Sequence, residues 1–278
     1  MPLWVSLSLL AGLSSSVSNI FYRTTLKGEQ DAALSTWLLQ ICRMACAIAF
    51  VIWLHITFTL QSVIILLCLG FVEIVGVYTY MRMHAMSALS VSSIIQRTRI
   101  LWTAILAAIF VGEAFTPLEV AGLLILFVGV SVVAAPQKLR EDKGILFAYV
   151  SAIMFSVTTV LIKATLSSIP PAAQVVGLAA PSIIVFPLIT KGFGARFRRF
   201  TSERLWMKLI AAFGNVAGLF LTVYAYAVGP AAKASAIFQG SLVLGVFAGI
   251  ILLGEKKDIW PKVVGSVVVL LGIVTVSL

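Results

Sequence analysis

Three arginines and one glutamate lie inside apolar stretches of the sequence, where charged side chains are rare. Arg97 and Arg99 lie in SIIQRTRILW, and Arg43 lies in LLQICRMACAIAF. Glu73 is the only carboxylate well inside such a stretch. An arginine at the bilayer centre costs about 2.5–3.5 kcal/mol on the insertion scale, so it should face protein or a water-filled cavity. Because a guanidinium suits a carboxylate or a phosphate, these residues indicate a buried site with surplus positive charge.

Helical spacing separates the two neighbouring arginines. At about 100° per residue, positions two apart point in nearly opposite directions. A strip about 60° wide on this helix would carry four polar residues: Ser92, Gln96, Arg99 and Thr103. We therefore expect Arg99 to bind a solute from this polar stripe, or else to form an internal pair, whereas Arg97 should point elsewhere.

Glu73 is the natural partner for an arginine that lies off the stripe. We expect it to pair with Arg97 or with Arg43, as a buried ion pair that fixes helix packing. The alternative role for Glu73 is to take up a proton during transport, because burial and nearby charges shift carboxyl groups. Arg43 is expected to serve packing or gating rather than to bind the solute.

Further candidates are polar or aromatic residues of other apolar stretches. Ser235 and Gln239 continue the polar stripe in the second part of the chain, so Gln239 should face Gln96 across a cavity. Asn215 aligns with Glu73 in the repeat described below. The remaining candidate cavity residues are Asn19, Thr159, Trp102, Tyr80 and Tyr224. Cys42 and Cys46 share a helix face, but we expect them to be small buried residues, and the soft ligands of YMRMHAM have no partner motif, so we expect neither a metal nor a cofactor.

The composition places these residues in a membrane protein. Of 278 residues, 61% are hydrophobic and 11% charged, and the mean hydropathy is +1.10. A soluble domain has about 45–50% apolar and about 25% charged residues. Apolar length predicts ten helical spans and an all-α fold; the first is expected to be retained and not cleaved. The predicted spans are 3–22, 33–53, 62–80, 87–111, 118–135, 144–165, 172–190, 205–228, 232–253 and 260–278.

The chain repeats itself at an offset of about 142 residues. SSVSNIFYRTTL aligns with FSVTTVLIKATL, and the Gly112-Glu113 pair aligns with Gly254-Glu255. Each half, residues 1–135 and 136–278, would hold five spans. Because five is odd, the second half must enter the membrane from the opposite side. Such inverted repeats are typical of secondary transporters, whose site lies between the halves near the mid-plane.

These motifs also resemble the drug/metabolite transporter superfamily, specifically proteins with two EamA-like domains. The resemblance rests on the five-plus-five layout, the basic residues Arg23 and Lys163, the intramembrane Arg43, and the "FVGE" and "LLGE" segments. It implies a transporter with a central cavity lined by both halves, for solutes such as amino acids, sugars, phosphorylated sugars or amines. The family often has a proline where this chain has Arg99.

Loop charge predicts the orientation. The loops around 23–31, 136–143, 191–204 and 254–259 hold most of the basic residues, about fifteen against two on the other side. The positive-inside rule places these loops in the cytoplasm and both termini outside, although many EamA-type relatives have cytoplasmic termini. The run RFRRF is expected to contact anionic headgroups of a bacterial or archaeal cytoplasmic membrane, not nucleic acid.

We therefore expect a secondary transporter for a small anionic or zwitterionic metabolite, such as an amino acid, an organic acid or a sugar phosphate. Proton coupling and a homodimer remain open. A flippase for a phosphate-bearing lipid or lipid-linked sugar is the alternative, because the same basic cavity could take a phosphate. A membrane-embedded enzyme is more remote, since the sequence has two histidines and no catalytic motif.

Overall fold

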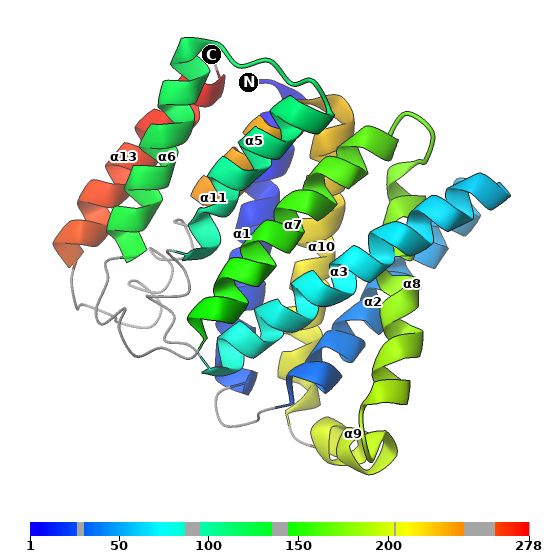
Figure 1. Cartoon of the computed structure of the whole chain (residues 1–278). Helices are drawn as coiled ribbons and strands as arrows, with labels where there is room; N and C mark the ends of the chain where they lie inside the picture. The colour runs from blue at the N-terminus through cyan, green and yellow to red at the C-terminus, as the bar shows by residue number, and fades with distance from the viewer. Residues whose placement is uncertain (27–30, 87–94, 135–143, 203, 242–258, 278) are drawn as a thin grey trace.

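The computed structural model describes the whole chain except residues 27–30, 87–94, 135–143, 203, 242–258 and 278. The described residues form helices and no strands (Figure 1). The helices are α1 (Leu3–Leu26), α2 (Ala32–Trp53), α3 (Leu60–Met86), α5 (Arg99–Phe110), α6 (Pro117–Ala134), α7 (Ile145–Thr165), α8 (Pro171–Ile189), α9 (Phe193–Ser202), α10 (Leu205–Val228), α11 (Ala231–Ser241) and α13 (Ile259–Ser277).

Six of the described helices are long and apolar enough to cross a membrane: α1, α2, α3, α7, α8 and α10. Two shorter apolar helices cover 117–132 and 263–277, within α6 and α13. The predicted spans 87–111 and 232–253 lie partly outside the described residues. The all-helical membrane fold is therefore confirmed, and the number of ten spans stays a prediction.

The packing repeats with the sequence. At the offset of about 142 residues, α1 corresponds to α7 and α3 corresponds to α10. In agreement, α1 packs along α10 just as α7 packs along α3, and α11 contacts α1 as α5 contacts α7. In two further pairs, α2 with α8 and α6 with α13, each helix packs against its own counterpart in the other half. The two halves are thus related by an internal pseudo-two-fold.

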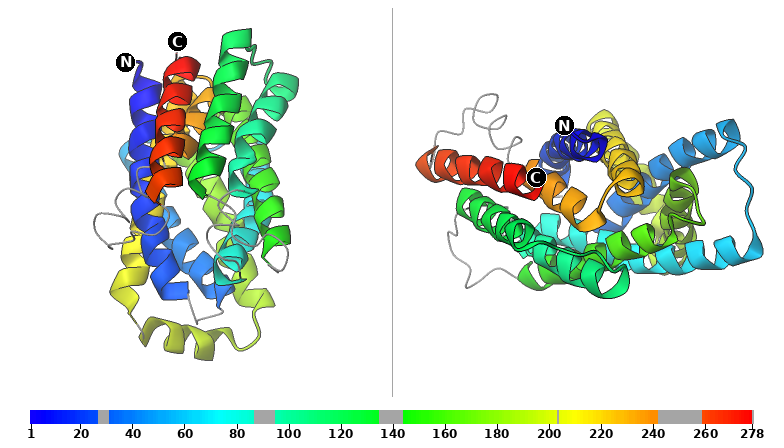
Figure 2. Two further views of the ribbon diagram at one scale, coloured as in Figure 1. Left: turned by 90° about the vertical axis from the view of Figure 1, so that its left-hand side faces the viewer. Right: turned by 90° about the horizontal axis from the view of Figure 1, so that it is seen from above.

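Helices α6 and α13 lie side by side (Figure 2), and their glycine contacts show this relation. A Cβ placed on Gly129 would lie 2.8 Å from the amide nitrogen of Val269. A Cβ placed on Gly272 would lie 2.8 Å from the amide nitrogen of Leu126. Gly272 and Val269 are the repeat counterparts of Gly129 and Leu126. The two backbones can approach this closely only because both glycines lack side chains.

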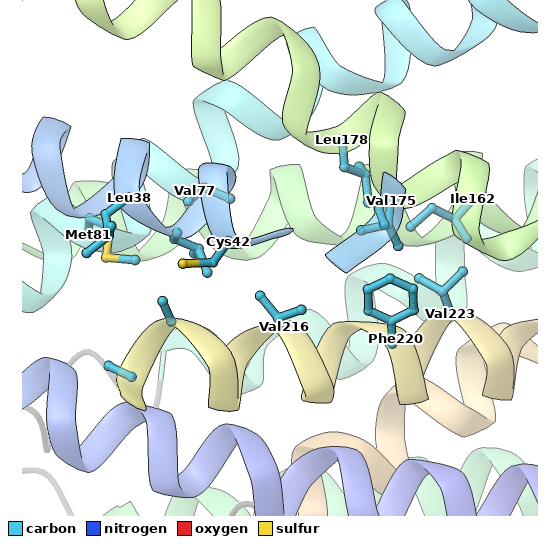
Figure 3. Close-up of a cluster of buried hydrophobic side chains, with 14 of the residues drawn as sticks. Leu38, Cys42, Val77, Met81, Ile162, Val175, Leu178, Val216, Phe220 and Val223 are labelled. Atoms are coloured by element: carbon cyan, nitrogen blue, oxygen red, sulfur yellow. The ribbon is translucent and has the colours of Figure 1, made fainter. Parts of the chain in front are cut away.

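A buried apolar cluster fixes the central helices. Figure 3 shows Val216, Phe220 and Val223 of α10 pointing toward side chains of α2 and α8, among them Cys42 and Val175. Buried residues of α1, α3, α7, α9 and α11 also belong to the cluster. Because Cys42 precedes Arg43, this packing also sets the position of the charged residue on α2.

Glu113 joins the two halves near the end of α5. Its carboxylate accepts hydrogen bonds from the amides of Ala231 at 2.5 Å and Ala232 at 3.1 Å, the first residues of α11. A carboxylate at a helix N-terminus satisfies amides that have no partner inside the helix. The "FVGE" segment therefore has a structural role in this fold.

The polar segment 191–204, read from the sequence as a loop, contains the helix α9. Phe193 and Phe197 lie one turn apart and contact Trp37 edge-on, at 5.1 and 5.2 Å between ring centroids. Arg196 pairs with Asp31 at 2.7 Å. Apolar residues at helical spacing form a helix face that packs on α2. Helix α9 lies at the end of the molecule opposite both termini (Figure 1).

Adding a methyl group at the α6–α13 contact should destabilise the protein. Gly129→Ala and Gly272→Ala place a Cβ against backbone atoms, and overpacking of this kind costs about 1–3 kcal/mol of the free energy of unfolding. Gly194→Ala is the matched control, because nothing lies within 4 Å of its added Cβ. Thermal unfolding in detergent measures all three. Equal midpoints for the three variants and the parent would contradict the packing.

Candidate functional site

A cavity of about 150 Å³ lies between helices of the two halves. One water needs about 10–15 Å³ of such space, so the cavity has room for on the order of ten waters. It is lined by ten of the residues singled out in the sequence: Asn19, Arg43, Glu73, Tyr80, Gln96, Arg97, Arg99, Thr159, Asn215 and Gln239. Residues from both repeats therefore converge on one site.

The cavity also has aromatic walls, of which the sequence analysis selected only Tyr80. Tyr80, Phe155, Tyr226 and Phe238 line it together with several aliphatic side chains. The hydroxyl of Tyr80 donates to Asn19 Oδ1 at 2.7 Å. Tyr80 lies seven residues after Glu73, on the same face of α3, so both side chains reach the same cavity.

Arg43 forms a fork at the centre of the site. Its Nη1 donates to Glu73 Oε1 at 2.7 Å and its Nη2 donates to Asn215 Oδ1 at 2.8 Å. A third bond joins Nη1 to Gln40 Oε1 at 3.3 Å. Arg43 is 4% exposed and Glu73 is 2% exposed. Of the two partners expected for Glu73, the structure has Arg43, and the pairing with Arg97 is wrong.

The helix that carries Arg97 and Arg99 is interrupted between them. The amide of Thr98 donates to the carbonyl of Ile95, three residues earlier, at 3.0 Å, and α5 begins at Arg99. The 100° spacing of a regular helix does not hold across such a tight turn. As a result both arginines line the cavity. The expectation that Arg97 points away from Arg99's site is therefore wrong.

The two arginines have neutral partners. Arg97 Nη1 donates to Gln239 Oε1 at 2.6 Å. Arg99 Nη2 donates to Thr159 Oγ1 at 2.8 Å, and its guanidinium lies 5.2 Å from the ring centroid of Phe155. Among the described residues, neither arginine forms an ion pair with a carboxylate. The Nε atoms of both are buried and have no hydrogen-bond partner there.

Gln96 and Gln239 do not face each other as expected. Gln96 Nε2 donates to the carbonyl of Ala148 at 3.1 Å and also contacts Ser151 Oγ, both on α7. Thr103 of the same predicted stripe bonds Ser156 Oγ at 3.1 Å. The polar stripe therefore serves largely to bind α5 and the residues before it to α7. Gln239 instead accepts a hydrogen bond from Arg97.

Four other predicted site residues do not line the cavity in the described part of the chain. Trp102 is 39% exposed, and Tyr224 packs against the main apolar cluster. Ser235 is fully buried outside the cavity, and its hydroxyl has no hydrogen-bond partner among the described residues. Ser92 lies outside the described residues. The helix face of a polar residue alone therefore does not tell whether the residue lines the cavity or packs against another helix.

The chemistry open to this site is anion binding. The guanidinium groups of Arg97 and Arg99 line a cavity in which, among the described residues, no carboxylate pairs with either of them. Arginine donors of this kind bind carboxylate or phosphate oxygens. Within the described residues, no group of three or more histidine, cysteine or acidic side chains could hold a metal.

Comparisons with known proteins agree with this architecture. The EamA-like transporter family matches the chain twice, over residues 2–135 and 142–278. A crystal structure of a protein 16% identical in sequence superposes with a TM-score of 0.73, covering 97% of this chain and 96% of the other. That likeness concerns the fold alone. No curated protein matches the sequence.

Removing Glu73 should cost more stability than removing the whole ion pair. Glu73→Ala leaves the Arg43 charge buried without its carboxylate, and breaking a buried pair in this way costs about 3–5 kcal/mol. The double variant Arg43→Met/Glu73→Leu removes both charges and should recover much of that loss. Thermal unfolding in detergent compares them. A double variant no more stable than Glu73→Ala would contradict the pairing.

Proposed function

Because the chain belongs to the EamA-like transporter family, we propose that it is a secondary transporter for a small anionic or zwitterionic solute. The observation that carries the proposal is the pair Arg97 and Arg99, which lines a cavity between the two halves with no carboxylate partner among the described residues. A buried charge without a partner is costly. A negatively charged group of the solute would offset that cost each time the solute binds.

In this proposal, ten spans form two inverted halves, residues 1–135 and 136–278, that alternate in exposing the cavity. The reciprocal contacts of Gly129 and Gly272 support it, because they are what a two-fold relation between the halves requires. Inverted repeats permit alternating access through a rocking motion around a fixed central site. The solute would bind where α5, α7, α10 and α11 supply donors.

Glu73 serves as an ion-pair residue in this proposal. Its 2.7 Å bond to Arg43 ties α3 to α2, and Asn215 ties the same guanidinium to α10. Proton coupling through Glu73 would require this pair to break in every cycle, so we place it second. The flippase is disfavoured by size, since a cavity for on the order of ten waters is small for a lipid-linked sugar.

We also propose that the end carrying α9 faces the cytoplasm. The basic segments 23–31, 136–143, 191–204 and 254–259 would then lie on one side, with both termini on the other. Arg198 and Arg199 of α9 are exposed while Phe200 is buried, so the basic face is turned outward. Anionic lipid headgroups attract such a face, by about 1 kcal/mol per basic residue.

Uptake into proteoliposomes tests the transport proposal. The panel should contain glutamate, succinate and glucose 6-phosphate, each with and without a pH gradient. Arg97→Gln and Arg99→Gln should each weaken uptake of the transported solute by about tenfold or more, because each removes one buried charge contact. Arg204→Gln is the matched control, since that exposed arginine lies at the start of α10. If Arg99→Gln transported as well as the parent, the site assignment would be wrong.

Topology reporters test the orientation. A reporter that is active only in the cytoplasm should be inactive at the C-terminus after Leu278, and active when fused after Lys191, just before α9. The positive-inside rule gives this result, because the basic loops remain on the side of insertion. Activity at the C-terminus together with inactivity after Lys191 would reverse the orientation.

A further inference from the structure

We infer that the solute is a dianion, either one doubly charged phosphate-like group or a pair of carboxylates. The inference rests on the proposed function and narrows it, since it favours neither monoanions nor zwitterions. Its basis is the number of positive charges around the cavity that no carboxylate of the described residues compensates. Three arginines and one glutamate are the ionised residues among the described lining.

The first arginine is already neutralised. Arg43 Nη1 donates to Glu73 Oε1 at 2.7 Å, and its Nη2 donates to Asn215 Oδ1 at 2.8 Å. Glu73 is nearly fully buried and forms no other ion pair among the described residues. The Arg43–Glu73 pair therefore contributes no net charge to the cavity.

The other two arginines keep their full charge. Gln239 and Thr159, their hydrogen-bond partners, are neutral. A guanidinium has five N–H donors, and among the described residues each of these two uses only one of its terminal nitrogens on a side chain. The buried Nε of Arg97 and that of Arg99 have no partner among the described residues. The lining thus offers two charged groups with unused donors.

The second half of the molecule shows that the fold does not need these charges. In the repeat, Gln96 aligns with Gln239, so Arg97 aligns with Gly240 and Arg99 with Leu242. The segment beginning at Ala231 forms its helix and packs against α5 without arginines at these positions. A structural requirement of the inverted repeat would apply to both halves. The two arginines are therefore a feature of the site, not of the scaffold.

Charge balance then selects the solute. A monoanion or a zwitterion would leave at least one positive charge uncompensated inside the membrane, where it is expensive. A phosphate monoester carries about −1.5 to −2 charges at pH 7 and three acceptor oxygens. A dicarboxylate supplies the same charge in two groups. Either one offsets both arginines.

The apolar lining and the volume of the cavity limit the size and polarity of the uncharged part of the solute. Leu39, Val77, Ile162 and Phe238 give the cavity an apolar side. Phe155 lies beneath the Arg99 guanidinium and limits its movement. With space for on the order of ten waters, the cavity suits a compact dianion of about ten non-hydrogen atoms.

Binding of matched ligands to the purified full-length protein in nanodiscs tests the inference. Phenylphosphonate and benzenesulfonate have the same shape but differ by one charge at about pH 8, where a phosphate-like group has lost its second proton. Succinate and its monoamide succinamate form the corresponding carboxylate pair, which distinguishes one doubly charged group from two single ones. Titration calorimetry gives the four dissociation constants.

We expect at least one dianion to bind about tenfold or more tightly than its monoanion, which corresponds to about 1.4 kcal/mol. In Arg97→Gln and in Arg99→Gln this ratio should fall toward one, while Arg204→Gln keeps it. A measurement on the parent alone gives a second check. Phenylphosphonate affinity should rise between about pH 6 and pH 8, following its second ionisation, while benzenesulfonate affinity stays constant.

Two results would overturn the inference in different ways. If each monoanion bound as tightly as its dianion, and both lost affinity in the arginine variants, the solute would be a monoanion and the proposed anion transporter would stand. If none of the four ligands bound, while a neutral or cationic solute was taken up by proteoliposomes, the dianion and the anionic part of the proposed function would both fail.

Discussion

The guanidinium of Arg43 joins three helices at a buried position in the lining of the cavity. Its nitrogens bind Glu73 of α3 and Asn215 of α10, which are counterparts in the two repeats. One arginine on α2 thus contacts the same position of both halves. Because it pairs with Glu73, the only carboxylate among the described residues of the cavity lining, none of these residues can neutralise the other two arginines. Within the described part of the chain, Arg97 and Arg99 have neutral partners.

The scaffold is symmetric and the site is not. Glycine contacts between α6 and α13, and the matched pairs α1–α10 and α7–α3, follow the two-fold relation closely. The arginines break it, because their counterparts in the second half are uncharged. In the proposed mechanism, the symmetric frame would supply two alternating conformations, and the asymmetric arginines would supply selectivity.

Much of this arrangement could be predicted from residues alone. Apolar length located the helices, and the repeated Gly112-Glu113 motif indicated the duplication. The scarcity of intramembrane charge selected Arg43, Glu73, Arg97 and Arg99, and all four line one cavity. Those inferences depend on the bilayer, whose hydrocarbon core makes any ionised side chain without a partner costly.

The errors arose where local geometry departs from a regular helix or where tertiary packing decides. The turn at Thr98 brings Arg97 to the cavity, and no spacing rule anticipates it. The side chain of Gln96 donates to the carbonyl of Ala148 on α7, and this contact depends on how the two segments pack. The segment containing Arg198 looked like a loop, because its charges masked the spacing of its phenylalanines.

A structure of the protein with phenylphosphonate bound would test the central claim most directly. Our account predicts phosphonate oxygens within about 3 Å of nitrogen atoms of both Arg97 and Arg99, with the bond between Arg43 and Glu73 unchanged. A ligand bound at Arg43 with Glu73 released, or one that leaves either Arg97 or Arg99 without a contact, would contradict it.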